Sequence, residues 1–393
     1  MDFETIAKKD KEYIMPTYGR FPVALEEGHG AVAVDCAGRE YVDFGSGIGV
    51  NSLGYAEPGW AEAVARQAAK LQHTSNLYYS EAQVKLAQRL CELSGMARAF
   101  LCNSGAEANE CAIKLARKYS FDTCGRGRGE IITLQNSFHG RTVTTLAATG
   151  QEVFHNYFFP FTEGFAYAPA GDMEALQNLV SEKTCAVMIE LVQGEGGVRP
   201  LDKGYVRALR NFCTEKNLLF IVDEVQTGVG RTGSFYAYQQ YGITPDVVTT
   251  AKGLGGGLPV GACLCTEALG DVMSAGTHGT TYGGNPIACA AASYVLEKVG
   301  QPEFLAEVRE KGAYMKAAIE KMPGVAGVRG LGMMLGVELT KGNAPAVAKA
   351  CLEKGLIVLT AKEVIRLLPP LNITCAEIDR GLAAMEAALA SLQ

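Results

Sequence analysis

The chain has 393 residues, more than one ordinary domain holds, so its length predicts two or three domains. Hydrophobic residues make up 48% and charged residues 20%, a composition typical of a globular protein and unlike that of a disordered or fibrous chain. The formal net charge of −6, without any basic cluster, argues against a nucleic-acid-binding surface.

The sequence also bears on compartment and metal content. No run of 18 apolar residues occurs, which argues against a membrane span, and residues 1–12 lack the apolar core of a signal peptide. The twelve cysteines are scattered without a CxxC pair, so we expect reduced thiols in a cytoplasmic protein. Five scattered histidines without an HExxH pattern predict no metal site.

The first hundred residues predict a hairpin and two helices. Alternating apolar residues on either side of a glycine turn at 37–39 predict a hairpin over residues 32–44. Helical periodicity follows over residues 58–72 and 80–93.

The next segment predicts a strand, a turn of small residues and a helix from about Ala106 to Tyr119. Small residues at the start of a helix leave backbone N–H groups free to bind a phosphate. Taken alone, however, a simple N-cap by Ser104 explains this pattern equally well.

Residues 130–193 alternate strands, at 131–134 and 185–190, with helices, which predicts a mostly parallel sheet. The loop after the first strand contains Phe138, which could stack on a planar ring, and Arg141, which could bind a carboxylate through two hydrogen bonds. A core phenylalanine and a surface arginine are the simpler interpretations of these two residues taken singly.

Two buried strands end on ionisable residues. An apolar run over 218–222 ends at Asp223, and a second run over 247–251 ends at Lys252. Ligands of open α/β sheets bind at the carboxyl ends of the strands. A lysine amine can condense with a carbonyl cofactor and an aspartate can keep a pyridine nitrogen protonated, so this pair predicts pyridoxal phosphate (PLP).

Other glycine patterns are weaker. Residues 228–233 match the dinucleotide pattern GxGxxG, but five residues separate them from the preceding apolar run and no clear helix follows. A dinucleotide-dependent oxidoreductase therefore remains a distant alternative. From about residue 300 the pattern changes to helices at 302–321, 343–354 and 376–391 with short strands between them, which predicts a smaller α+β domain.

Together these motifs resemble a class III (subgroup II) aminotransferase of PLP fold type I, and the resemblance covers nearly the whole chain. It implies an α/β fold whose large domain has a mostly parallel central sheet, with a smaller α+β C-terminal domain and an N-terminal segment packed on it. The domains are expected at 1–57, 58–290 and 291–393. The matching motifs lie at residues 103–110, 138–141, 193–195, 223–228, 252, 281–286 and 366–371.

The resemblance also implies a role for each site residue. Lys252 and Asp223 are the expected catalytic residues, the first bonded to PLP and the second paired with its pyridine nitrogen. The other expected cofactor contacts are Ser104, Gly105 and Ala106 at the phosphate, Phe138 and Val225 on the ring faces, Gln226 at the ring hydroxyl, and Thr281 from the second subunit of a homodimer. The expected substrate contacts are Tyr18, Arg141, Glu195, Thr280 and Arg366, with Glu195 covering Arg366 in one half-reaction.

The reaction implied is transfer of the δ-amino group of N2-acetyl-L-ornithine to 2-oxoglutarate, by a ping-pong route through pyridoxamine phosphate, as in arginine biosynthesis. Ile48 stands where ornithine δ-aminotransferases usually carry a tyrosine, which disfavours free ornithine. Tyr55 stands where the family usually has a histidine. Succinyl-diaminopimelate, succinylornithine and 4-aminobutyrate remain open as amino donors. A PLP aminomutase and a catalytically dead binding protein are further alternatives.

Overall fold

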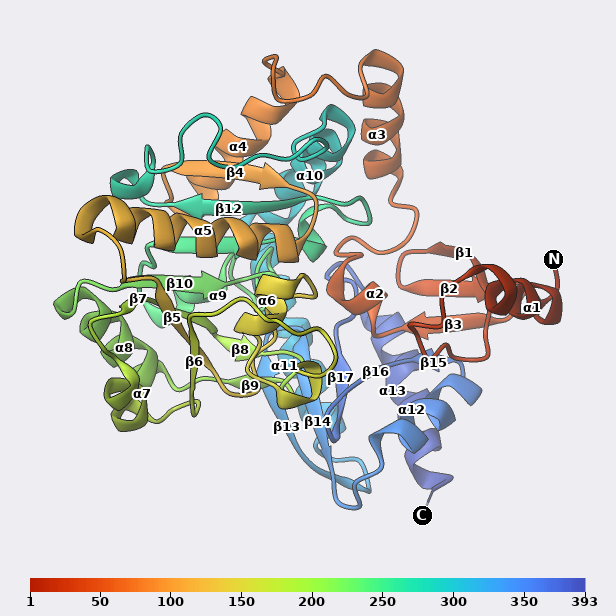
Figure 1. Ribbon diagram of the computed structural model, residues 1–393. Coiled ribbons are helices and arrows are strands. Elements are labelled where there is room, and N and C mark those ends of the chain that lie inside the picture. The colour runs from red at the N-terminus through yellow and green to blue at the C-terminus, as the bar shows by residue number, and fades with distance from the viewer. Residues whose placement is uncertain (393) are drawn as a thin grey trace.

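The computed structural model describes residues 1–392 and is built around a seven-stranded sheet (Figure 1). Strand β12 is antiparallel to both of its neighbours, while every other pairing in this sheet is parallel, so the predicted mostly parallel sheet is confirmed. In spatial order the strands are β4 (Arg98–Cys102), β12 (Gly261–Cys265), β11 (Val247–Thr250), β10 (Leu219–Asp223), β7 (Thr184–Glu190), β5 (Glu130–Leu134) and β6 (Phe165–Ala168).

Side chains alternate between the two faces of this sheet, and each face has its own helices. On β10, Ile221 belongs to a buried cluster with Ile113 of helix α5 (Gly105–Cys124), which lies across the front of the sheet in Figure 1. Phe220 belongs to a second cluster with Leu209 of α8 (Lys203–Glu215) on the opposite face. The same alternation places Asp223, two residues after Ile221, on the α5 face.

A four-stranded antiparallel sheet forms the C-terminal part, in the order β13 (Val325–Leu331), β14 (Met334–Leu339), β17 (Val364–Leu367) and β16 (Leu359–Ala361). Strand β13 was not predicted, because Gly327 and Gly330 interrupt its apolar pattern. The predicted C-terminal helices correspond to α11 (Pro302–Ile319), α12 (Ala344–Glu353) and α13 (Cys375–Ala390).

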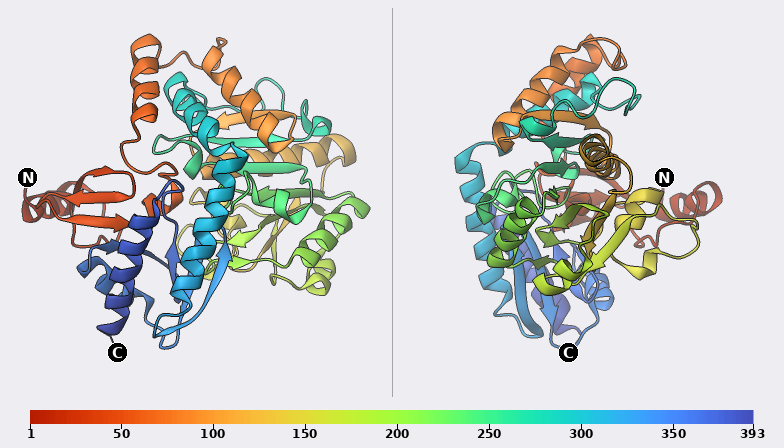
Figure 2. Two further views of the ribbon diagram at one scale, coloured as in Figure 1. Left: turned by 180° about the vertical axis from the view of Figure 1, so that it is seen from behind. Right: turned by 60° about the vertical axis from the view of Figure 1, so that its left-hand side comes forward.

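The N-terminal strands β1 (Leu25–His29), β2 (Val32–Asp35) and β3 (Glu40–Asp43) share a sheet with β15 (Leu356–Ile357), which is parallel to β3. Residues close to both ends of the chain are therefore paired. Helix α1 (Phe3–Tyr13) lies at the outer edge of this sheet and buries none of its residues (Figure 2). Most of its eleven residues are polar or charged, which explains why hydrophobic periodicity did not predict it.

The predicted domain bounds stay a prediction. The bound at residue 290 falls inside the continuous helix α10 (Pro286–Val299), and Gln393 lies outside the described residues. The remaining elements are α2 (Ser46–Gly49), α3 (Pro58–Lys70), α4 (Glu81–Ser94), α6 (Val143–Ala148), α7 (Met173–Leu179), α9 (Ala237–Tyr241), β8 (Val192–Gln193), β9 (Arg199–Pro200) and three short 3-10 helices at 152–154, 252–254 and 267–269.

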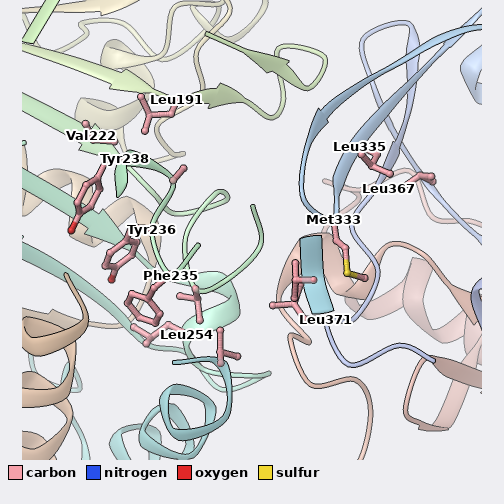
Figure 3. Close-up of a cluster of buried hydrophobic side chains, with 14 of the residues drawn as sticks. Leu191, Val222, Phe235, Tyr236, Tyr238, Leu254, Met333, Leu335, Leu367 and Leu371 are labelled. Carbon is pink, nitrogen blue, oxygen red and sulfur yellow. The ribbon is translucent and has the colours of Figure 1, made fainter. Parts of the chain in front are cut away.

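The central and C-terminal sheets share one continuous core. Val222 and Tyr236 from the central part belong to the same buried cluster as Met333 and Leu367 from the C-terminal part, as Figure 3 shows. Burial of this apolar surface stabilises the position of one sheet relative to the other. Within residues 1–392, none of the helices has the length and hydropathy needed to cross a bilayer.

Candidate active site

A cavity of about 390 Å³ opens at the carboxyl ends of the central strands. Its lining combines the phosphate-loop candidates, the two strand-end residues and the loop after β5, which lie far apart in the sequence. The predicted site residues in the lining are Ser104, Gly105, Ala106, Phe138, Arg141, Asp223, Val225, Gln226 and Lys252.

Three hydrogen bonds hold the buried carboxylate of Asp223. Its Oδ2 accepts a hydrogen bond from Asn109 Nδ2 at 2.8 Å and lies 2.8 Å from His139 Nδ1. Its Oδ1 accepts from the N–H of Val225 at 3.0 Å. Burial of His139 opposes its protonation, but the hydrogen bond and charge of Asp223 outweigh burial and raise the pKa of His139. A buried carboxylate held in this way could pair with a protonated pyridine nitrogen.

Lys252 lies two residues after the end of β11, the strand that neighbours β10, and is half-buried in the cavity lining. Its φ of 43° lies in the left-handed region, which non-glycine residues seldom occupy. Burial lowers the pKa of Lys252 against the opposing charges of Glu195 and Asp223. A lower pKa increases the fraction of the neutral amine, the form that attacks a carbonyl carbon.

The N-terminus of α5 supplies exposed backbone to the same cavity. Ser104 Oγ accepts the N–H of Glu107 at 3.2 Å, so the simple N-cap is present. Gly105 and Ala106 also line the cavity, and a Cβ on Gly105 would lie only 2.7 Å from Cγ1 of Val225. The absence of a side chain at residue 105 therefore leaves room at a helix N-terminus, where an anion is favoured.

Arg141 lies against two aromatic rings. The carbon of its guanidinium is 4.2 Å from the ring centre of Phe154 and 5.4 Å from that of Phe138. Stacking of this kind orients a guanidinium without satisfying its hydrogen bonds. Arg141 is solvent-exposed, so its donors are available to a substrate carboxylate.

Arg366 reaches the site from β17 and is buried. Its Nη1 donates to Glu195 Oε1 at 2.5 Å and to Gln226 Oε1 at 3.2 Å. Burial opposes ionisation of Glu195, but the charge and hydrogen bond of Arg366 outweigh it and lower the pKa of Glu195. The structure thus brings the predicted Glu195–Arg366 pair together at the junction of the two sheets.

Five predicted residues are not part of the cavity lining of this single chain. Glu195 and Arg366 lie beside it, where Arg366 bonds to Gln226, and the other three are Tyr18, Thr280 and Thr281. Tyr18 is 75% exposed and has its aromatic contact with Arg20. Thr281 is exposed. The Thr280 hydroxyl accepts a hydrogen bond from Asn103 Nδ2 at 3.0 Å, and Asn103, unlike Thr280, lines the cavity.

Sequence reasoning missed Asn109, His139 and Glu190, which line the base of the cavity. Glu190 offered a signal, because it ends a buried strand just as Asp223 does. Among residues 1–392, no three His, Cys, Asp or Glu side chains are grouped so as to hold a metal ion.

The arrangement fits the parts of PLP. The α5 N-terminus could hold a phosphate, Asp223 a protonated pyridine nitrogen and Lys252 a carbonyl carbon. Phe138 and Val225 line the same cavity and could contact an aromatic ring. A strand-end acid, a strand-end amine and an anion site in one cavity define a transaminase-type site.

Comparison with known proteins agrees with the geometry. The family model described as aminotransferase class-III matches residues 13–389, so the chain belongs to the class-III aminotransferases. It is accordingly a PLP-dependent transaminase that acts on small amino and oxo acids, and the predicted family, fold class and cofactor are confirmed.

Individual relatives match over nearly the full length. The chain is 49% identical to the acetylornithine aminotransferase of Haemophilus ducreyi, with 100% of both chains covered. It is 44% identical to the succinylornithine transaminase of Citrobacter koseri over 94% of this chain and 93% of that one. An ornithine aminotransferase structure from Toxoplasma gondii, with partial PLP occupancy in its active site, has a TM-score of 0.94 at 31% identity, covering 99% of this chain and 94% of that one.

The space beside Gly105 gives a first prediction. Gly105→Ala should weaken PLP binding about tenfold or more, because the added Cβ meets Val225 and obstructs the helix N-terminus. Cofactor content after dialysis, read from absorbance, measures the effect. Gly129→Ala is the matched control, since its nearest neighbouring atom is 3.8 Å away. Equal cofactor retention in both variants would contradict the prediction.

The raised pKa of His139 gives a second prediction. The pKa of His139 is higher in the folded protein than the value of about 6.5 expected in the unfolded chain. Its contribution to the free energy of unfolding is therefore complete below about pH 6.5 and is lost as the pH rises through the pKa of the folded state. His139→Asn keeps a donor toward Asp223 but cannot titrate. Urea unfolding of cofactor-free protein should therefore show a larger destabilisation by this variant at pH 6 than at pH 9. A difference that grows with pH would refute the assignment.

Proposed function

We propose that the chain transfers the δ-amino group of N2-acetyl-L-ornithine to 2-oxoglutarate, giving N-acetylglutamate 5-semialdehyde and glutamate. The observation that carries the proposal is the pair of guanidinium groups, one free and one covered. Arg141 is exposed, whereas Arg366 is buried under Glu195. The Haemophilus ducreyi relative named acetylornithine aminotransferase, identical at 49% of positions, supports the same donor.

The two guanidiniums match the different charges of the two substrates. The acetylated donor has one carboxylate, remote from the amine that reacts, and Arg141 is free to bind it. Glutamate and 2-oxoglutarate have two carboxylates, of which Arg141 binds one and Arg366 the one beside the reacting carbon. Glu195 neutralises Arg366 while the donor is bound, because a buried guanidinium without a partner is costly.

PLP, when bound, supplies an electron sink for the carbon that loses its proton and carries the amino group from one substrate to the next. The chain's own residues hold and move protons around it. Asp223 would keep the pyridine nitrogen protonated, and the neutral amine of Lys252 would take the proton from the substrate carbon and deliver it to the former aldehyde carbon of the cofactor. The α5 N-terminus, Val225 and Phe138 fix the ring in place, while Gln226 bonds its hydroxyl.

Another donor with an ω-amino group is the second candidate, favoured by the 44% identity to the Citrobacter koseri succinylornithine transaminase. A succinyl group adds a carboxylate that an acetyl group lacks. The Glu195–Arg366 pair supports an external amino acceptor, and so weighs against an aminomutase. The half-buried Lys252 and the buried Asp223, both in the cavity lining, weigh against a dead scaffold.

The proposed enzyme is a cytoplasmic homodimer whose two sites are shared. Large apolar side chains next to Thr281 are open to solvent in the single chain, with Leu77 87% and Tyr79 103% exposed. Exposure of this extent supports a partner surface. Asn76 Nδ2, which precedes Leu77, donates to the carbonyl of Thr280, so the two loops form one surface. A second copy covering this surface would receive Thr281 at the phosphate of its cofactor.

A half-reaction experiment tests the proposed donor. PLP-loaded protein is mixed separately with N2-acetyl-L-ornithine, succinylornithine, N-succinyl-L,L-diaminopimelate and 4-aminobutyrate, and the absorbance of cofactor bound to Lys252 is followed. We expect the fastest loss with acetylornithine and recovery on addition of 2-oxoglutarate. A faster loss of absorbance with another amine would identify that amine as the donor and leave the reaction class unchanged.

The cover over Arg366 gives a further prediction. Glu195→Ala should lower kcat/KM of the acetylornithine half-reaction about tenfold and that of the glutamate half-reaction much less. Without Glu195, Arg366 competes with Arg141 for the single carboxylate of the donor and holds the donor in an unproductive position. Glu195→Gln, which keeps a hydrogen-bond acceptor without the charge, should fall between wild type and Glu195→Ala. Equal losses in both half-reactions would rule out this role of Glu195.

A further inference from the structure

Glu190 is a buried carboxylate that the proposed reaction does not use. It is the last residue of β7 and lies at the base of the cavity. Its Oε2 accepts the N–H of Phe138 at 2.9 Å, and its Oε1 accepts the N–H of Gly194 at 3.3 Å. One carboxylate therefore holds two loops that come from different strands.

Each of these loops carries one of the two groups proposed to meet the substrates. Arg141 follows Phe138 by three residues, and Glu195 follows Gly194 directly. A second bond joins the same loops, from Gln193 Nε2 to the carbonyl of Gln135 at 2.8 Å. The same contacts therefore help to fix the positions of both Arg141 and Glu195.

Because both donors to Glu190 are backbone N–H groups, the link between the two loops depends on whether the Glu190 carboxyl group is ionised. An ionised carboxylate accepts two N–H donors, one on each oxygen, whereas a protonated acid gives up part of this capacity to its own O–H. Burial, and then the negative charge of Asp223, raise the pKa of Glu190 to about 7 against the opposing charge of His139. The ammonium form of Lys252 is a further charge that interacts with Glu190.

We propose that Glu190 is a positioning residue that holds the loops of Arg141 and Glu195 together, and thereby sets the KM of both substrates. The inference rests on the proposed function for the roles of Arg141 and Glu195. Glu190 itself does not touch the reacting atoms in this account. Loss of its ionised form frees both loops at once.

Glu190→Gln tests the proposal with a matched control. The amide retains one acceptor oxygen but opposes the other backbone N–H with its own donor. Glu224→Gln is the control, because Glu224 is also fully buried at the end of the neighbouring strand but accepts from Thr227 Oγ1 at 2.5 Å and from the N–H of Tyr238 at 2.9 Å. Both variants lose one hydrogen bond, but only Glu190→Gln loosens the site loops.

Hydrogen–deuterium exchange gives a readout that is independent of turnover. In cofactor-free protein, Glu190→Gln should speed exchange about tenfold in peptides covering both 135–142 and 192–198, the equivalent of one lost charge-assisted hydrogen bond. Glu224→Gln should leave both peptides unchanged. Faster exchange in one of the two peptides alone, in neither, or equally in the control variant would overturn the proposal.

Isotope exchange between unlabelled glutamate and labelled 2-oxoglutarate, which needs no other substrate, completes the test. We expect KM for both to rise about tenfold in PLP-loaded Glu190→Gln while kcat changes less than about twofold. Because acetylornithine is not used here, an error in the proposed donor leaves this test intact. A fall in kcat with unchanged KM values would contradict a positioning role.

Wild-type protein provides the same test if the variant does not fold. Exchange in both peptides, corrected for the intrinsic pH dependence of amide exchange, should rise together as pH falls through about 7. The acidic limb of the pH profile of kcat/KM should be displaced in Glu190→Asp, a second variant that keeps a carboxyl group at this position. Protection of both peptides that stays constant between pH 8 and pH 6 would refute the proposal.

Discussion

The buried carboxylate of Asp223 is the constraint on which the site depends. A charge removed from water is costly unless hydrogen bonds satisfy it, and here the donors come from three separate places. Asn109 lies on α5, His139 on the loop after β5, and the N–H of Val225 on the chain just beyond β10. The helix and both loops must therefore converge on one strand end before the charge can be buried.

Charges of both signs alternate around that carboxylate, which explains why the site is a unit. Asp223, Glu190 and Glu195 face His139, Lys252 and Arg366. The charge of a neighbour is among the causes that shift the pKa values of His139, Glu190, Glu195 and Lys252. Removing one member leaves an opposite charge without its partner in a medium of low dielectric constant. Effects of substitutions within this group should consequently be non-additive.

The sequence was sufficient for the two central strands β10 and β11 and for the ionisable residues at their carboxyl ends. Short apolar runs before Asp223 and Lys252 place both at one edge of a parallel sheet. Asn109 and His139 could not be found in this way, since a polar residue in a helix or a loop has no distinctive pattern until α5, β5 and β10 lie together. Strand β13 was not predicted for a different reason, because its glycines weaken the alternation of apolar and polar residues that marks a strand.

A fixed Glu190 and a movable Glu195 explain how one cavity can bind two substrates of different charge. Glu190 is fully enclosed and bonded to backbone, so its position follows from the fold. Glu195 is 29% exposed at its side chain and is bonded to another side chain, so it can leave Arg366 without disturbing a strand. Rigidity at the strand end and freedom five residues later in the chain are thus compatible, because Gly194 lies between Glu190 and Glu195, and Gly196 and Gly197 follow Glu195.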